Sequence, residues 1–232
     1  MKKIILSLIA LGVSFALPQN AYCDNADWAN LGAYRANNAE VLAKPFDTNR
    51  VVFMGDSITE FWDKEGKGLF ANQSYINRGI SGQTTPQMLL RFRADVIALK
   101  PKVVVILAGT NDIAGNTGPA TNEMIEDNIA SMCDLAKSHK IKIVLSSILP
   151  ASRYYWAPDM RPAPRIVELN KWIKAYAKAN NIIYLDYNTP MNDGADGLPL
   201  KYSGDGVHPN KDGYAVMDAL VKKAITQALK SK

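Results

Sequence analysis

Strand-like segments alternate with longer amphipathic segments along this 232-residue chain, and this alternation constrains the fold more than any other feature. Most of the strand-like segments are short and rich in valine, isoleucine and leucine, which is typical of strands buried on both faces. Strands joined by helices at this spacing form a parallel sheet covered by helices on both faces. We expect strands at residues 50–55, 75–80, 103–107, 141–149 and 182–186, with the strongly apolar 103–107 at the centre.

Helices are predicted between these strands. Apolar residues at helical spacing predict a helix at 27–44 on the outside of the domain and a long amphipathic helix at 123–140. Further helices are expected just after residue 57, at 84–100, at 163–179 and beyond residue 209. The chain has no internal repeat and no low-complexity linker, so we expect one α/β domain.

The N-terminal region has the composition of a targeting segment. Lys2 and Lys3 precede an apolar run at 4–17, and polar residues follow from position 18. This order is typical of a secretory signal peptide. We therefore expect a signal peptide at 1–23, a domain at 24–232, a secreted or periplasmic location and no stable insertion in the membrane. The alternative is that Cys23 is lipidated and anchors the mature protein to a membrane.

Charge and cysteine content exclude several kinds of partner. Cleavage after residue 23 would remove two of the 27 basic residues and none of the 22 acidic ones, which leaves a formal charge of +3. This value is too small to indicate a nucleic-acid partner. Cys133 lies in a helical apolar pattern and is predicted to be a buried small hydrophobe. No cysteine–histidine cluster indicates a structural metal, and we expect no metal and no other cofactor.

A candidate nucleophile follows the first strand. The segment Gly55-Asp56-Ser57 places a hydroxyl just beyond the carboxyl end of that strand. In open α/β sheets this edge is where ligands bind. The alternative is that Asp56 or Ser57 only caps the next helix.

A nucleophilic serine needs a base, which is usually a histidine oriented by a carboxylate. His208 follows the last strand, and Asp205 three residues earlier can turn back to hold its ring. The alternative is that 205–209 only caps the last helix. His139 lies at the lysine-rich end of a helix and is predicted to be solvated.

Acyl transfer also needs hydrogen-bond donors where negative charge develops on the carbonyl oxygen. Gly79 and Asn111 follow the second and third strands and could supply a backbone N–H and a side-chain amide. In isolation, a glycine after a strand usually marks a turn, and an Asn-Asp pair often caps a helix. Together with Ser57 and His208, however, these residues place four reactive groups beyond strand ends at one edge.

Four sequence blocks in this order resemble those of the SGNH hydrolases, also called GDSL-type esterases and lipases. The resemblance covers essentially all of 50–230, with Gly-Asp-Ser-Ile in place of Gly-Asp-Ser-Leu in the first block. The blocks are Gly55-Asp56-Ser57-Ile58-Thr59, Asn77-Arg78-Gly79-Ile80-Ser81-Gly82, Gly109-Thr110-Asn111-Asp112 and Asp205-Gly206-Val207-His208-Pro209.

The resemblance implies a fold and a set of roles. The implied fold is a three-layer α/β/α sandwich of flavodoxin-like type around a five-stranded parallel sheet. Ser57 would be the nucleophile, His208 the base and Asp205 the acid that orients it. The oxyanion hole would consist of the Ser57 N–H, the Gly79 N–H and the Asn111 side chain. Supporting roles are implied for three neighbours of these residues: Asp56, Asn77 and Asp112.

Within the family, the blocks are most similar to the branch of platelet-activating-factor acetylhydrolases and lysophospholipase L1. Many bacterial members of that branch deacetylate carbohydrates, so we expect a carbohydrate acetylesterase that acts on small acyl groups. The alternatives are a lysophospholipase or thioesterase, which needs a long apolar channel, and an acyltransferase that uses the same residues.

An aromatic segment at 152–162 is expected to lie over the serine. Tyr154, Tyr155 and Trp156 could stack on a sugar or form the wall of an acyl pocket. Arg153 or Arg161 could meet an acidic sugar or a phosphate. The alternative is that the aromatic residues only hold this loop in place.

Overall fold

The computed structural model describes residues 27–66 and 68–230, so the predicted signal peptide and Cys23 lie outside the described residues. Its centre is a five-stranded, wholly parallel sheet with the strand order β2-β1-β3-β4-β5. The predicted parallel sheet and its predicted central strand are confirmed. The strands are β1 (Val51–Gly55), β2 (Tyr75–Gly79), β3 (Val103–Ile106), β4 (Lys142–Ser146) and β5 (Ile183–Leu185).

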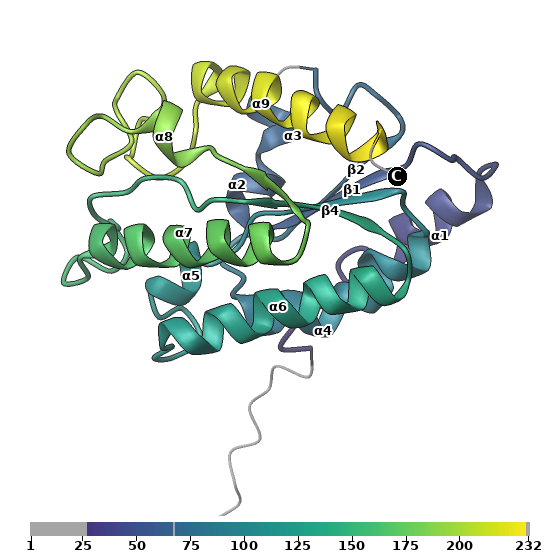
Figure 1. The fold of residues 1–232 in the computed structure, drawn as a ribbon, viewed down its shortest axis with the longest axis horizontal. Helices are drawn as coiled ribbons and strands as arrows, with labels where there is room; N and C mark the ends of the chain where they lie inside the picture. Colours follow the sequence, from purple (N-terminus) through teal and green to yellow (C-terminus); the bar gives the residue numbers. More distant parts are fainter. Residues whose placement is uncertain (1–26, 67, 231–232) are drawn as a thin grey trace, which may run out of the picture.

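Helices cover both faces of the sheet and form the predicted three layers (Figure 1). One layer contains α4 (Thr85–Asp95), α6 (Asn122–Ser138) and α7 (Pro162–Ala179), with α1 (Arg35–Ala43) beside α4 and α5 (Thr110–Ile113) near α7. The opposite layer contains α2 (Ser57–Glu60), α3 (Trp62–Glu65), α8 (Asn188–Met191) and the long α9 (Lys211–Lys230). Among the described residues, none of the helices has the length and apolarity that crossing a bilayer requires.

The two faces of the sheet bury separate hydrophobic cores, because successive side chains of a strand point to opposite faces. Met54 and Ile106 belong to the core under α4, α6 and α7. Phe53 and Val105, their neighbours in the chain, belong to the core under α9. Cys133 of α6 is fully buried, as predicted.

Strand register aligns the carboxyl ends of the strands. Gly55 at the end of β1 lies opposite Gly79 at the end of β2, and Met54 lies opposite Ile106 of β3. The segments that follow these strands therefore emerge at one edge of the sheet, as predicted. This edge carries the candidate site.

The predicted helix at 27–44 is wrong in its first part. Turns occupy the stretch before residue 35, because the Asp27 carboxylate accepts hydrogen bonds from the N–H groups of Leu31 (2.6 Å) and Gly32 (2.7 Å). Asn30 adopts a left-handed conformation with φ of 53°, which also interrupts a helix. The predicted helix at 84–100 ends at Asp95 and continues only as a 3₁₀ turn, η1 (Ile97–Leu99).

Candidate active site

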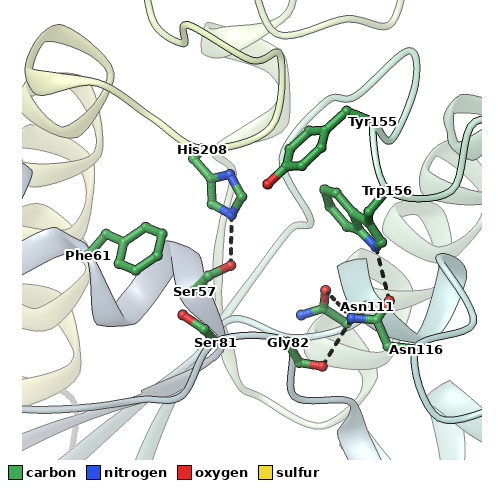
Figure 2. A pocket seen from close by; sticks show the side chains of 9 residues that line it. All are labelled: Ser57, Phe61, Ser81, Gly82, Asn111, Asn116, Tyr155, Trp156 and His208. Carbon is green, nitrogen blue, oxygen red and sulfur yellow. Dashed lines mark hydrogen bonds between the residues drawn. The ribbon is translucent and has the colours of Figure 1, made fainter.

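Ser57 is the first residue of α2 and follows β1 after one intervening residue. Asp56 caps the helix, since its carboxylate accepts a hydrogen bond of 2.9 Å from the Ile58 N–H. This cap turns the chain sharply at the end of the strand and leaves the serine hydroxyl free to point away from the sheet. Ser57 Oγ lies 2.9 Å from His208 Nε2 (Figure 2).

The second nitrogen of the same imidazole meets a carboxylate. His208 Nδ1 lies 2.7 Å from Asp205 Oδ2. A carboxylate can only accept here, so Nδ1 carries the proton and Nε2 accepts the hydrogen bond from the Ser57 hydroxyl. His139, in contrast, is exposed at the C-terminal end of α6, as predicted.

Asp205 is held in place by its own loop. Its Oδ1 accepts hydrogen bonds of 2.8 Å from the N–H groups of both Val207 and His208. Gly206 between them has a φ of 81°, which glycine adopts without strain. Partial burial raises the pKa of Asp205, but the hydrogen bonds from the His208 ring and the two N–H groups outweigh it and lower the pKa below its usual value. Asp205 is therefore ionised at neutral pH beside the imidazole.

Gly79 was predicted as an oxyanion donor, and the structure contradicts this prediction. Its N–H donates a hydrogen bond of 2.8 Å to Asn77 Oδ1. The residue also packs beneath α2, where an added Cβ would lie 2.1 Å from the Glu60 backbone nitrogen. The N–H is thus engaged within the fold.

Gly82 lies three residues further along the chain. It lines the cavity that contains Ser57 and has a φ of 76°. Its N–H makes no hydrogen bond to any described residue. The same holds for the N–H of Ser57 at the start of α2. Both backbone donors are available to a substrate oxygen.

Asn111 in α5 lies beside these donors, and its amide has a defined orientation. Asn116 Nδ2 donates to Asn111 Oδ1 (3.0 Å) and to the Gly82 carbonyl (3.2 Å) (Figure 2). Asn111 Nδ2 must therefore point the other way, where it donates to the Gln83 carbonyl at 3.1 Å and lies 3.4 Å from Asp56 Oδ2. The longer of these two contacts is weak, so the N–H that makes it is available to hydrogen-bond an oxyanion instead.

The aromatic loop connects to this network. Trp156 Nε1 donates a hydrogen bond of 3.0 Å to Asn116 Oδ1. A continuous chain of donors and acceptors thus runs from the loop through Asn116 to Asn111 (Figure 2). We infer that the loop helps to hold the amide of Asn111 in its orientation.

The cavity at the candidate site has a volume of about 210 Å³. Phe61, Tyr155 and Trp156 form aromatic walls, and the ring centroids of Phe61 and His208 lie 5.5 Å apart (Figure 2). This cavity is also lined by residues that were not predicted from the sequence to belong to the site. Ser81 and Gly82 lie within the recognised second block, whereas no sequence signal marks Phe61 or Asn116.

Three of the five residues predicted to contact substrate do not line this cavity. Tyr154 is fully buried, and its ring stacks on that of Trp156 with ring centroids 4.9 Å apart. Arg153 and Arg161 are exposed and are not part of the lining. Tyr155 and Trp156 do line the cavity. One aromatic side chain of the segment is buried and the next two line the cavity, so this segment both holds the loop and forms the wall.

The three residues with predicted supporting roles form buried contacts next to the site. Asn77 Nδ2 donates to the Thr59 carbonyl (2.7 Å), which ties β2 to α2. Asp112 accepts hydrogen bonds from the N–H (3.0 Å) and hydroxyl (2.6 Å) of Thr85, which ties α5 to α4. Burial raises the pKa of Asp112, and it raises the pKa of Asp56 to about 6.

Comparison with known proteins gives concordant matches. Residues 53–216 match the model of the GDSL-like lipase/acylhydrolase family. A crystal structure of a GDSL-like lipase from Bacteroides thetaiotaomicron is 48% identical, with a TM-score of 0.83 over 86% of this chain and 98% of that one. Acetylxylan esterase from Geobacillus stearothermophilus is 26% identical over 72% of this chain and 90% of its own length.

The predicted branch is also represented among the relatives. Platelet-activating factor acetylhydrolase IB subunit alpha2 from Rattus norvegicus is 25% identical over 77% of both chains. The family match covers most of the described chain, and it includes the segments that carry Ser57, Asn111 and His208. The chain belongs to the GDSL-like lipase/acylhydrolase family and is an ester-bond hydrolase.

Proposed function

We propose that this protein is a serine esterase that removes small acyl groups, chiefly acetyl, from carbohydrates through an acyl-enzyme intermediate. The observation that carries the proposal is the continuous contact from Ser57 Oγ to His208 Nε2 (2.9 Å) and from His208 Nδ1 to Asp205 Oδ2 (2.7 Å). This arrangement activates a hydroxyl that is otherwise a weak nucleophile.

The proposed reaction has two halves. His208 Nε2 takes the Ser57 proton while Oγ attacks the ester carbonyl, and Asp205 stabilises the resulting imidazolium. The imidazolium then gives its proton to the departing alcohol as the C–O bond breaks. In the second half the same histidine deprotonates water, which attacks the acyl-enzyme and releases the carboxylic acid and free Ser57.

The tetrahedral intermediates carry a negative oxygen that needs donors. We assign the N–H of Ser57, the N–H of Gly82 and the amide of Asn111 to this oxyanion hole, because all three line one cavity. Loss of one such donor typically weakens transition-state binding by about 3 kcal/mol. The network from Trp156 through Asn116 supports the third donor, since it prevents the amide of Asn111 from turning over.

Size and polarity of the cavity support a small acyl group on a sugar. At about 210 Å³ it is smaller than the roughly 300–1,000 Å³ typical of pockets for larger ligands. Its lining combines aromatic faces with hydroxyl and amide groups, as a sugar requires, and none of the described lysines or arginines belongs to it. The acetylxylan esterase among the relatives supports the same assignment.

Two substitutions test the chemistry. Ser57→Ala and His208→Ala should each lower kcat for p-nitrophenyl acetate by about 10⁵–10⁶-fold while circular dichroism shows an intact fold. His139→Ala is the matched control, because that imidazole is exposed and distant in sequence from the site, and it should retain normal turnover. Normal turnover by folded Ser57→Ala would contradict the proposal.

A substrate panel tests the acyl group and the alcohol. We expect kcat/KM to fall from acetyl to octanoyl nitrophenyl esters and to be higher for acetylated sugars than for lysophospholipids. The reverse order would favour a lysophospholipase or thioesterase. Transfer of acetyl to an added sugar, in preference to water, would identify an acyltransferase.

We further propose that residues 1–23 are a signal peptide and that the mature protein is secreted or periplasmic. The basic start and the apolar run of this segment support the assignment. N-terminal sequencing of protein exported by a bacterial host should give a chain that begins at residue 24. Recovery of a chain that begins with lipid-modified Cys23 would support the anchored alternative, and retention of Met1 in exported protein would contradict both.

A further inference from the structure

A second hollow adjoins the candidate active site. We call it the Trp28 groove and define it by Trp28, Asn30, Gly82, Gln87, Asn116 and Thr117, which line it. Its volume is about 640 Å³, compared with about 210 Å³ for the cavity at Ser57. Ser81, Gly82 and Asn116 line both spaces, so these three residues form the ridge between them.

The side of the groove that carries Trp28 is a fixed part of the fold. Gln87 Nε2 donates a hydrogen bond of 2.8 Å to the Trp28 carbonyl. Gln83, which is buried, donates a hydrogen bond of 2.8 Å to the Ala29 carbonyl, and Ala29 is itself buried. The Asp27 carboxylate closes the following turn through Leu31 and Gly32. The backbone of Trp28 is therefore anchored on both sides.

Trp28 as a whole residue is 46% exposed although its backbone is anchored. An aromatic ring held on a rigid backbone loses little conformational entropy when it binds a flat ligand face. The ridge residue Asn116 separates this indole from a second one, because Trp156 lies in the catalytic cavity and is hydrogen-bonded to Asn116. Two aromatic side chains thus occur on the two sides of one ridge.

The chemistry of the groove selects a class of ligand. Within the described ranges 27–66 and 68–230, neither lysine nor arginine lines it, so no basic side chain there attracts a phosphate or an acidic sugar. Asp27 is the one charged residue in the described lining, and both oxygens of that carboxylate already accept hydrogen bonds. A long acyl chain would lie against the amide and hydroxyl groups of Asn30, Gln87 and Thr117 and would gain little from burial there. An uncharged sugar matches this lining, since a pyranose has an apolar face for an indole and hydroxyls at its edge.

We propose that the Trp28 groove binds a second, uncharged sugar unit of an acetylated oligosaccharide, next to the unit whose acetyl group is held at Ser57. The chain would cross the ridge at Asn116, and Trp28 would stack on the sugar beyond it. This inference rests on the proposed carbohydrate esterase function and adds a preference for oligosaccharides over monosaccharides.

The test compares Trp28→Ala with the unaltered protein on acetylated xylo-oligosaccharides from monosaccharide to tetrasaccharide. In the unaltered protein kcat/KM should rise from monosaccharide to disaccharide. Trp28→Ala should lower kcat/KM on the disaccharide and longer substrates by about tenfold, mainly through KM, which corresponds to one aromatic contact. Trp28→Phe should keep most of this activity. Turnover of p-nitrophenyl acetate, which is too small to reach the groove, should stay within about twofold.

Phe46→Ala is the matched control, since that ring is exposed and lines neither the groove nor the cavity. It should leave every substrate unaffected. Equal loss on all substrates in Trp28→Ala would show a purely structural role, and equal kcat/KM for monosaccharide and disaccharide in both proteins would show that the groove binds no sugar. Either result overturns the inference and leaves the proposed function intact. Cleavage of p-nitrophenyl acetate with no acetylated sugar accepted would overturn the carbohydrate specificity and the inference together.

Discussion

At the residue scale, Asp205 acts on His208 through both position and charge. Its Oδ2 lies 2.7 Å from Nδ1 of the ring, and its Oδ1 accepts hydrogen bonds from the N–H groups of Val207 and His208. These contacts keep Asp205 ionised, because they lower its pKa against the opposing effect of burial. The ring can therefore become an imidazolium beside a negative charge.

This arrangement predicts a graded effect for Asp205→Asn. The substituted amide keeps most of the shape but cannot hold the correct tautomer or offset the imidazolium charge, so kcat for p-nitrophenyl acetate should fall by about 10³–10⁴-fold. Some activity should remain above that of Ser57→Ala, since the base is still present. Asp212→Asn, at the exposed start of α9, is the control and should behave normally. An unchanged kcat in Asp205→Asn would remove Asp205 from the mechanism.

Asp56 shows the opposite electrostatic situation. It is 1% exposed, and burial raises its pKa from 3.8 to about 6. The folded protein therefore holds this proton more tightly than the unfolded chain does. The resulting stabilisation is present below about pH 4 and is lost as the pH rises through about 6.

Asp56→Asn should remove this pH dependence while an amide oxygen still caps α2. The free energy of unfolding of the variant, relative to the unaltered protein, should rise by on the order of 3 kcal/mol between pH 4 and pH 7. Urea unfolding of both proteins at several pH values measures this difference. Groups that titrate in both proteins contribute equally to the two free energies, so their effect cancels in the difference. A difference that stays constant with pH would show that Asp56 titrates normally in the folded protein.

At the scale of elements, the contact between β2 and α2 sets the shape of the site. Gly79 allows the two backbones to approach closely, because an added Cβ would meet the Glu60 nitrogen at 2.1 Å and the Asp56 carbonyl oxygen at 2.7 Å. These neighbours are backbone atoms and cannot move aside as a side chain can. The carboxyl end of β2 is thereby held against the helix that starts at Ser57.

Gly79→Ala should therefore destabilise the fold by more than about 3 kcal/mol, as overpacking against backbone does. Gly204→Ala is the matched control, since a Cβ at that position has no neighbour within 4 Å. It should change the free energy of unfolding by less than about 0.5 kcal/mol. Equal stability of the two variants in urea would show that β2 and α2 are not in this close contact.

The regular elements could be predicted from the sequence more fully than the site could. The short apolar runs and their spacing predicted all five strands and the central position of 103–107. The signal is strongest for β1, β3 and β4, because these strands are buried on both faces. The helix predicted at 27–44 was too long, since the Asp27 carboxylate competes with the helix for the N–H groups of Leu31 and Gly32.

Two details of the site needed three-dimensional contacts. Gly79 and Gly82 both follow β2, and only the hydrogen bond from Gly79 to Asn77 shows which N–H is engaged. Tyr154 and Tyr155 are identical in type, yet one is buried and the other lines the cavity. Neither composition nor spacing distinguishes the members of these pairs.

At the scale of the whole molecule, one sheet carries two cores. Ile106 of β3 is buried under the layer of α4, α6 and α7, and Met217 of α9 is buried on the opposite face. The sheet lies between the two cores. Because each core needs the sheet to be formed, the domain should unfold as one unit.

Ile106→Ala and Met217→Ala should each lower the free energy of unfolding by about 2–5 kcal/mol. In both variants, tryptophan fluorescence and far-ultraviolet circular dichroism should report the same urea midpoint. Trp62 lies in the core with Met217, and Trp172 packs against the core with Ile106, so fluorescence reports on both. Separate midpoints would show that the two layers unfold independently.

The central claim is that Ser57 becomes acylated, and covalent trapping tests it most directly. Brief reaction with an acetyl ester, acid quenching and peptide mass spectrometry should show an acetyl group, or the adduct of a fluorophosphonate probe, on the peptide that contains Ser57. Ser57→Ala should give no adduct. His208→Ala should give far less adduct than the unaltered protein, because Ser57 then lacks the imidazole that lies 2.9 Å from its hydroxyl. Stoichiometric acylation of a different residue, with turnover retained in Ser57→Ala, would contradict the account.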